Sequence, residues 1–441
     1  MATWYNRGMQ SSTSADIRTI RLGFLGFGTV GEGTYRMLVG NADEVFAKTS
    51  AKFEVVRVGV RDLTKVRGVA AEFITDDLRS VVLDPSIDVI LELMGGEEPA
   101  GEMVQLALEQ GKHVVTANKE LIAKHGSRLI GEAKSRGLDL HFEAAVGGGI
   151  PVVQPLKHQL AGNDVIKMMG ILNGTTNFIL SKMEAEGADF GEVLAEAQRL
   201  GYAEADPSAD VDGFDTMYKI SILAAICFGK QIPLEDVHRE GIRSVSAADM
   251  KYAKQFGFKI KLLGICEEIG EGEVMVRVHP TFVPLGHQLA NVNGVYNAVW
   301  LHGDFVGDLM FSGRGAGADP TASAVVGDLI DVARNLVAGG SGSAIPYGVG
   351  MRVTSIKELE SRYYVRFEVE DQPGTLGDIA TSFSRYQVGL AQMEMVTKVG
   401  GKGEIAFMTH VCQEGNFRSA LEAVASLGCV SRLEGWFRVE E

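Results

Sequence analysis

The chain has 441 residues, of which 46% are hydrophobic and 22% charged, values typical of a globular protein that divides into two or three domains. Its formal net charge of -15 argues against a nucleic-acid partner, because phosphate binding requires clustered Lys and Arg. No apolar run is long enough to span a membrane, and the four cysteines show no metal-ligand or redox spacing. We therefore expect a cytoplasmic protein with reduced thiols and no membrane partner. Residues 1–17 are aperiodic and predict a loose tail, with a transit peptide as the alternative.

A short apolar strand at 18–25 runs directly into a glycine-rich turn and then a helix. The glycines form G-x-G-x-x-G in the strand–turn–helix context of a dinucleotide site, where backbone N–H groups approach a pyrophosphate at a helix N-terminus. A glycine turn that merely packs a helix on a sheet is the less favoured interpretation. The predicted cofactor contacts in this turn are Gly26, Phe27, Gly28, Thr29, Val30 and Gly31.

The second predicted strand ends near Val60, where an NAD-specific fold usually places an acid that binds the ribose hydroxyls. Here Arg61 comes first, followed by Asp62, with Lys65 close behind. A cation at this point suits a 2′-phosphate, so the sequence favours NADP as the cofactor, with NAD as a second option. The alternative is that Arg61 is simply solvated.

Strand and helix patterns alternate up to residue 146, which predicts a Rossmann-type, doubly wound parallel sheet over 18–146. Ligands of such sheets lie beyond the carboxyl ends of the strands, and Thr116, Lys119 and Glu143 follow predicted strands. Lys119 is therefore expected at the mouth of the cofactor crevice, with Thr116 near it. The alternative for Lys119 is a solvated lysine at the start of a helix.

From residue 147 to 312 the pattern changes, and we expect an α+β domain for substrate binding and dimerisation. A predicted strand ends in the segment Asn173–Asn177, which includes Gly174 and Thr175. These small polar residues could bind a substrate, and turn chemistry explains them equally well. Alternating strands follow at 273–283 and 297–305, and they predict a sheet that continues across a subunit interface. His279 and His302 lie in them without ligand spacing and are interpreted as structural.

The least ordinary stretch is 197–219, which places five carboxylates and one lysine in and around the loop between two predicted helices. Lys219 lies near the start of a helix with almost no polar face, so its ammonium must find a partner or lose its proton. Asp215 lies four residues earlier on the same helical face, and Glu204 and Asp210 precede it. We interpret these residues as functional. The alternatives are a helix cap for Asp215 and an acidic surface turn for the whole loop.

The last third of the chain predicts a helix, a linker and a small regulatory module. Residues 313–338 combine a glycine-rich turn with a helix that we expect to pack back on the first domain, bringing Gly315 to the cofactor. Residues 339–360 have linker composition. Residues 361–441 read as strand, helix, strand, strand, helix and strand, the order of a ferredoxin-like module.

Together these motifs resemble the homoserine dehydrogenase family, in the form that carries a C-terminal ACT domain. The resemblance rests on the spacing of Gly201, Asp206, Asp210, Asp215 and Lys219, with GFGTVG, TANK at 116–119 and EAAVGGGIP from residue 143. It implies NAD(P)-dependent interconversion of L-aspartate 4-semialdehyde and L-homoserine, on the path to threonine, methionine and isoleucine.

The resemblance also implies a role for individual residues. Lys219 is the expected acid/base and Lys119 the catalytic partner that holds substrate and cofactor. The expected substrate-binding residues are Glu204, Asp215, Asp210, Gly174 and Thr175. A structural monovalent cation, sodium, would be held by Glu143 with the backbone carbonyls of Val146, Gly148 and Ile150.

For the ACT module the resemblance implies an amino-acid effector, threonine, and for the whole chain a homodimer or homotetramer. Two rival functions stand beside this one. An acylating aldehyde dehydrogenase needs a Cys at a strand end beside a His, which the sequence lacks. A non-catalytic sensor of NADPH and an amino acid is the alternative from another class.

Overall fold

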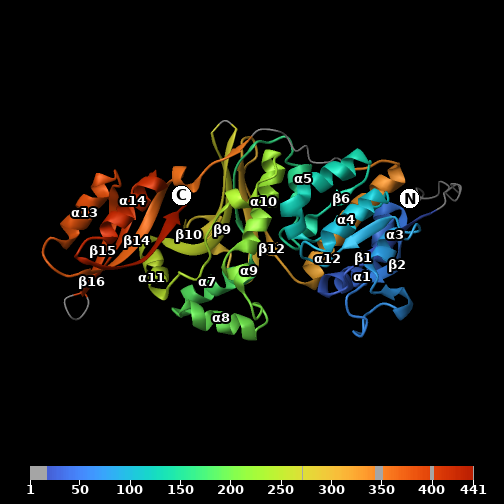
Figure 1. The fold of residues 1–441 in the computed structure, drawn as a ribbon, viewed down its shortest axis with the longest axis horizontal. Helices are drawn as coiled ribbons and strands as arrows, with labels where there is room; N and C mark the ends of the chain where they lie inside the picture. Colours follow the sequence, from blue (N-terminus) through green and yellow to red (C-terminus); the bar gives the residue numbers. More distant parts are fainter. Residues whose placement is uncertain (1–16, 271, 343–350, 398–401, 441) are drawn as a thin grey trace, which may run out of the picture.

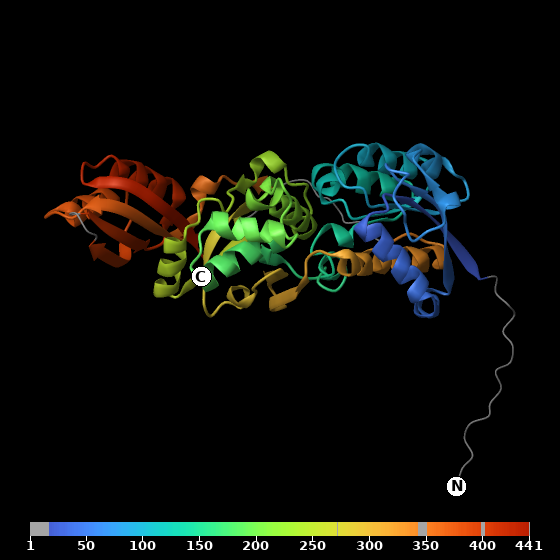
Figure 2. The ribbon, with the colours of Figure 1, turned by 90° about the horizontal axis from the view of Figure 1, so that it is seen from below.

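The computed structural model describes residues 17–270, 272–342, 351–397 and 402–440. The predicted tail, except residue 17, and residues 343–350 of the predicted linker lie outside this range. The molecule is elongated, with a dinucleotide-type domain at one end, a sheet domain in the middle and a ferredoxin-like domain at the other end (Figures 1 and 2). No helix in the described part of the chain is both long and apolar enough to cross a bilayer.

The first domain is a parallel sheet with strand order β3-β2-β1-β4-β5-β6, which confirms the predicted Rossmann-type topology. Its strands are β1 (Arg18–Leu25), β2 (Ala51–Gly59), β3 (Ile74–Thr75), β4 (Val89–Glu92), β5 (His113–Thr116) and β6 (Leu140–His141). Because both faces are covered, β4 and β5 are buried along their whole length.

The helices of this domain are α1 (Thr29–Gly40), α2 (Ala42–Thr49), α3 (Leu78–Leu83), α4 (Ala100–Glu109) and α5 (Lys119–Ser135). A sixth helix, α12 (Ala318–Ala338), returns from far along the chain and packs against α1. The contact is close because Gly33 on α1 has no side chain: a Cβ there would lie 2.8 Å from the Ala318 carbonyl oxygen. Val325, Val326 and Leu329 of α12 are fully buried in the same core.

The middle domain packs helices on an antiparallel sheet of β7 (Val165–Ile171), β9 (Phe258–Gly270), β10 (Glu273–Pro284), β11 (Tyr296–Gly303) and β12 (Gly307–Arg314), with β8 (His238–Arg239) pairing to β10. Its helices are α6 (Val153–Lys157), α7 (Gly174–Glu186), α8 (Phe190–Arg199), α9 (Ser208–Val211), α10 (Phe214–Phe228) and α11 (Ala247–Phe256). The apolar helix predicted after residue 213 is α10, and Ile220, Ile222 and Leu223 on it are buried.

Two local features differ from the sequence interpretation. The segment expected to be a turn at Asn173 opens helix α7, because the Asn173 side chain accepts a hydrogen bond from the Thr176 N–H and so caps the helix. Gly213 occupies the cap position of α10, with φ 83°, so Asp215 is the second residue of the helix and not its cap. The neighbouring Asp212 carboxylate pairs with Arg243.

The C-terminal domain has the predicted ferredoxin-like order, β14 (Glu360–Glu370), α13 (Thr375–Arg385), β15 (Leu390–Thr397), β16 (Lys402–Thr409), α14 (Glu414–Ala425) and β18 (Val430–Val439). Its strands pair in the order β18-β14-β16-β15. The strands predicted at 273–283 and 297–305 lie in the sheet of the middle domain, which continues within the chain into the C-terminal domain because β18 pairs with β10 at Thr281–Arg438 and Phe282–Val439. The middle and C-terminal domains therefore share one sheet (Figure 1).

Candidate active site

The largest cavity near the glycine turn has a volume of about 640 Å³ and opens between the ends of β1, β2 and β4. Gly26 to Thr29 form one wall, and Leu93 to Gly95 form the opposite wall. Gly26 has φ 93°, and a Cβ there would lie 2.7 Å from the Leu93 carbonyl oxygen, so only glycine fits. A groove of this size at the carboxyl ends of parallel strands is where a dinucleotide binds.

Three cations, Arg61, Lys65 and Arg67, line the same cavity beyond β2. The nearest carboxylate, Asp62, accepts hydrogen bonds from the N–H and hydroxyl of Thr64 at 2.9 and 2.6 Å. These bonds lower the pKa of Asp62 and hold its carboxylate on the turn. The cavity therefore offers exposed cations to a phosphate where an NAD-specific site would offer an acid.

Not every predicted cofactor residue lines this cavity. Val30 and Gly31 lie in the first turn of α1 and are absent from the wall. Thr116 is fully buried and donates a hydrogen bond to Glu92 at 2.6 Å. Gly315 packs against Gly148 and Asn297, where a Cβ would lie 2.0 Å from the Asn297 side-chain nitrogen. The structure thus places Gly315 at the 143–150 loop, away from the wall of this cavity.

The segment that carries Lys119 is hydrogen-bonded to the loop beside the cofactor cavity. Asn118 caps α5 through a hydrogen bond to the Leu121 N–H and donates to the Gly96 carbonyl at 2.7 Å. Glu92 accepts from the N–H groups of Met94 and Gly95. Burial raises the pKa of Glu92 despite these bonds. Lys119 therefore begins its helix beside the loop at which the predicted nicotinamide end of the cofactor would lie.

Asp215 joins the two lysines singled out from the sequence. Its Oδ1 lies 2.8 Å from Lys119 Nζ and its Oδ2 lies 2.7 Å from Lys219 Nζ. Lys219 Nζ also donates to the Leu172 carbonyl at 2.8 Å. The Asp215 side chain is 7% exposed and that of Lys219 10%, whereas that of Lys119 is 43% exposed. The Lys219 ammonium is thus enclosed and the Lys119 ammonium faces solvent, and both pair with the same carboxylate.

The two lysines have pKa values shifted in opposite directions. Burial lowers the pKa of Lys219, although Asp215 partly offsets it. The attraction of Asp215 raises the pKa of Lys119. Although burial alone would raise the pKa of Asp215, the two ammoniums hold it well below its usual range. Pairs of titratable groups with opposed shifts are characteristic of sites that move protons.

Asn173 completes the cluster and was not predicted as a site residue. Its side-chain nitrogen donates to Asp215 at 2.9 Å and to Asp210 at 2.7 Å, so one amide holds both carboxylates. Burial and the neighbouring Asp215 raise the pKa of Asp210. The available sequence signal was the cap position of Asn173 at a strand end, directly before a helix.

The remaining predicted substrate residues lie at different depths. The Thr175 hydroxyl donates to the Tyr202 carbonyl at 2.7 Å, and Gly174 has no room for a side chain because a Cβ would lie 2.9 Å from the Val295 carbonyl oxygen. Glu204 is exposed, and its carboxylate is not among the hydrogen-bonded or paired groups of the described chain. The structure therefore brings Asp210 to the lysine cluster and leaves Glu204 at the surface.

The loop predicted to hold a cation begins at Glu143, which is buried. Its carboxylate accepts hydrogen bonds from the N–H groups of Val152, Val153 and Gln154 at 2.6–2.9 Å. Burial nevertheless raises its pKa. No group of three His, Cys, Asp or Glu side chains suited to a metal occurs in the described residues, so a cation here would depend on main-chain oxygens.

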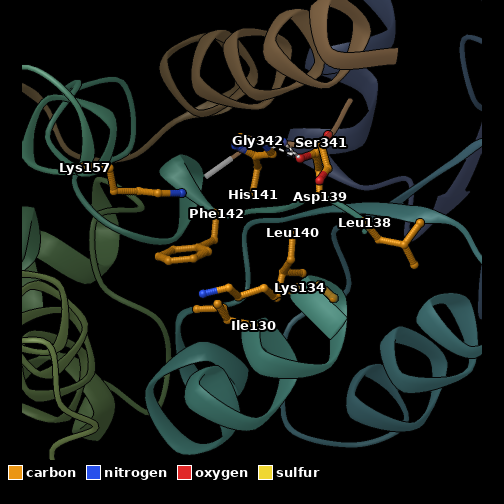
Figure 3. Close-up of a pocket in the computed structure, with 11 residues that line it drawn as sticks. Ile130, Lys134, Leu138, Asp139, Leu140, His141, Phe142, Lys157, Ser341 and Gly342 are labelled. Carbon is orange, nitrogen blue, oxygen red and sulfur yellow. Dashed lines mark hydrogen bonds and ion pairs between the residues drawn. The ribbon is translucent and has the colours of Figure 1, made fainter. Parts of the chain in front are cut away.

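A second cavity lies beneath β6, next to this loop (Figure 3). Lys157 and His141 line it, and Lys157 lies 5.6 Å from the centre of the Phe142 ring. Burial lowers the pKa of Lys157 and brings that of His141 to about 3. The volume is only about 50 Å³, too small for a dinucleotide, and the cavity beside Gly28 stays the candidate cofactor groove.

A Rossmann groove beside two lysines on one carboxylate, joined to a ferredoxin-like module, defines the class of the protein: a nicotinamide-dependent oxidoreductase with an appended regulatory domain. Family models give the same division, with "Homoserine dehydrogenase, NAD binding domain" matching residues 26–143, "Homoserine dehydrogenase" residues 151–330 and "ACT domain" residues 363–429. The chain belongs to the homoserine dehydrogenase family, and its activity is the oxidoreductase activity of that family.

Relatives agree over nearly the full length. Homoserine dehydrogenase of Synechocystis sp. is 46% identical over 432 residues, covering 96% of this chain and 99% of the relative. That of Mycobacterium tuberculosis is 42% identical, with 96% and 98% covered. A solved homoserine dehydrogenase from Thiobacillus denitrificans superposes with a TM-score of 0.91 at 40% identity, covering 96% and 99%. A hyperthermophilic archaeal homoserine dehydrogenase in complex with NADPH is 25% identical, with a TM-score of 0.60 and coverage of 76% and 100%.

Proposed function

We propose that the chain reduces L-aspartate 4-semialdehyde to L-homoserine with NADPH, and that Lys219 supplies the proton. The observation that carries this proposal is the sharing of Asp215 by an enclosed lysine of lowered pKa and an exposed lysine of raised pKa. When bound, the reduced nicotinamide supplies the hydride.

Addition of hydride to an aldehyde develops negative charge on its oxygen, so the site must offer a proton. Lys219 holds one on a nitrogen already fixed by Asp215 and Leu172, and its lowered pKa makes transfer easier near neutral pH. Lys119 keeps its charge because Asp215 raises its pKa. It would attract the developing oxyanion and orient substrate and cofactor without giving up its own proton.

The amino group of the substrate needs an anion. We assign it to Asp210 and Asp215, which Asn173 holds together, with Thr175 and Gly174 forming the adjoining helix start. Glu204 belongs to the proposed set on the family resemblance alone, since its side chain lies at the surface in this arrangement. Replacing Asp210 by Asn should raise the KM for aspartate semialdehyde more than Glu204→Gln does.

The cations beyond β2 support NADP over NAD. We expect Arg61→Ala to weaken NADPH binding by about tenfold and to leave NADH binding nearly unchanged, because only NADPH has the 2′-phosphate. Equal losses for both nucleotides in a fluorescence titration would exclude a contact between Arg61 and that phosphate.

For the cation we propose sodium at the 143–150 loop. The carbonyls of Val146, Gly148 and Ile150 belong to buried residues and accept no hydrogen bond from any other residue that the structure describes, which fits ligation by main-chain oxygen. With Glu143 they would hold the ion and stiffen the junction of the first two domains. Thermal unfolding in sodium compared with tetramethylammonium salts tests this without any assay of activity.

At the ACT domain we propose an amino-acid effector, threonine, and for the whole protein a cytoplasmic homodimer or homotetramer. One experiment tests most of these assignments: oxidation of NADPH by the purified chain with aspartate semialdehyde, with and without threonine. Turnover that threonine reduces supports the proposal. NADPH and threonine binding without turnover would instead support a non-catalytic sensor.

A further inference from the structure

Two of the strands that pair with β10, β8 and β18, leave a gap between them along its length. β8 pairs with β10 at Arg277 and Val278, and β18 pairs with it at Thr281 and Phe282. Pro280 lies between these pairs and has no N–H to offer either strand. A cavity of about 420 Å³ occupies the gap.

The two walls of this cavity come from different domains. Residues 240, 241, 243 and 244, which follow β8, form one wall with Asp212, and Gly435, Trp436 and Phe437 of β18 form the other. The first wall belongs to the middle domain and the second to the ACT domain. Any molecule in this cavity would therefore contact both domains at once.

The cavity contains charged groups of both signs. Arg243 forms a bidentate pair with Asp212, at 2.5 and 3.0 Å, and its side chain is 48% exposed. Glu240 accepts from Arg438 at 3.0 and 3.1 Å and lies 2.8 Å from His238, and its side chain is 34% exposed. One exposed guanidinium and one half-buried carboxylate, which also accepts from Arg418 at 3.5 Å, lie beside Trp436 and Phe437 and match a small zwitterion with an apolar part.

We propose that this cavity binds a free α-amino acid, with its carboxylate on Arg243 and its ammonium on Glu240. The inference rests on the proposed effector function and adds its location: the junction of the ACT domain with the middle domain.

The cavity is connected to the catalytic helix. Asp212 stands two residues before α10, and Arg239 donates to the Asp212 carbonyl while its guanidinium lies 3.5 Å from the centre of the Phe214 ring. Asp215, on the same turn of α10, holds Lys119 and Lys219. A ligand carboxylate on Arg243 competes with Asp212, and the competition acts directly on the start of α10. Binding is therefore expected to lower turnover.

The test uses the full-length protein, with threonine as the first probe. We expect Ser244→Trp, which fills the cavity from an exposed wall position, to raise the half-inhibitory threonine concentration by about tenfold or more, with turnover in the absence of threonine within about twofold of wild type. Arg243→Gln should weaken threonine binding similarly in calorimetry. The matched control is Arg432→Gln, an exposed arginine of β18 that pairs with Glu434 outside the cavity and should change nothing.

Two analogues test the charge assignment. N-acetyl-L-threonine lacks the ammonium and L-threoninamide lacks the carboxylate, so each should bind at least about tenfold more weakly than threonine. Unchanged inhibition by threonine in both Ser244→Trp and Arg243→Gln would overturn this location while leaving the effector function intact. An active wild-type enzyme that binds none of threonine, methionine and isoleucine would instead overturn the effector function itself.

Discussion

Two of the charge clusters in the described part of the chain have opposite stoichiometry. At the candidate active site one carboxylate, Asp215, is shared by two ammoniums. At the junction with the ACT domain two carboxylates enclose each guanidinium: Arg277 lies between Glu267 and Glu440, and Arg438 between Glu414 and Glu240.

This difference separates a site that does chemistry from a site that holds domains together. Each of these buried arginines has two carboxylate partners, and their pKa values are raised, so they stay charged at any working pH. The lysine cluster has two ammoniums for the one carboxylate of Asp215. Lys119 is partly exposed, and Lys219 has a lowered pKa. Two cations on one carboxylate suit a reaction in which negative charge develops on the substrate.

The largest effect expected is on Lys219. Its replacement by Met should reduce turnover by about a hundredfold or more and leave NADPH affinity within about twofold, because the proton donor is lost and the cofactor groove is untouched. Stopped-flow kinetics and NADPH titration measure the two quantities.

Lys261 provides the matched control for that substitution. It is a second buried lysine of lowered pKa, about 8, with burial as the cause, and it donates to the Val292 carbonyl and to Asn177. Lys261→Met should lower the thermal midpoint with turnover of the folded enzyme within about threefold. A hundredfold loss there as well would mean that any buried lysine behaves this way, and the comparison would fail.

At the junction, Arg277→Met should destabilise the protein by about 3 kcal/mol, because Glu267 and Glu440 would remain buried with only Lys167 to pair. Turnover of the folded enzyme should stay within about threefold. Urea denaturation of the variant, beside Arg334→Met at an exposed pair, measures the difference. Equal free energies of unfolding for the two variants would show that the buried ion pairs of Arg277 do not stabilise the protein.

The smallest effect is a shift in pH dependence. Asp215 raises the pKa of Lys219 against the effect of burial, so Asp215→Asn should lower that pKa further. Reduction requires the protonated lysine, and its rate falls as pH rises through the lysine pKa. The alkaline fall of kcat for the variant should therefore begin at lower pH than in wild type. A profile that moves to higher pH would contradict the assignment of Lys219 as the acid.

The sequence predicted the three-domain fold class and the closeness of Asp215 to Lys219 because local patterns determine both. Helical spacing puts these two residues on one face, and strand–helix alternation sets the topology of the first sheet. The segment Phe258–Gly270, which forms β9, was not singled out, although Gly264 within it allows α10 to approach: a Cβ there would lie 2.9 Å from Ile220.

Local sequence patterns do not predict contacts between segments that are far apart in the chain. Lys119 meets Asp215 across 96 residues, and Asn173 joins two carboxylates about 40 positions away. Its glycine-rich surroundings predict Gly315 at the cofactor. In the structure its backbone instead packs closely against Gly148, where a Cβ would lie 2.5 Å from the Gly315 carbonyl oxygen. The charges of the domain junction, such as Arg277 and Arg438, resemble ordinary surface residues of alternating strands until their partners are known.

The shared sheet has a practical consequence for engineering. Because β18 lies beside β10 and Glu440 reaches both Lys167 and Arg277, deleting the ACT module would remove a strand that pairs with the middle domain and leave these two cations with Glu267 as their remaining shared partner. If the proposed amino-acid effector is to be prevented from acting, point substitution is therefore the route, since removal of the last domain would also damage the scaffold that carries α10.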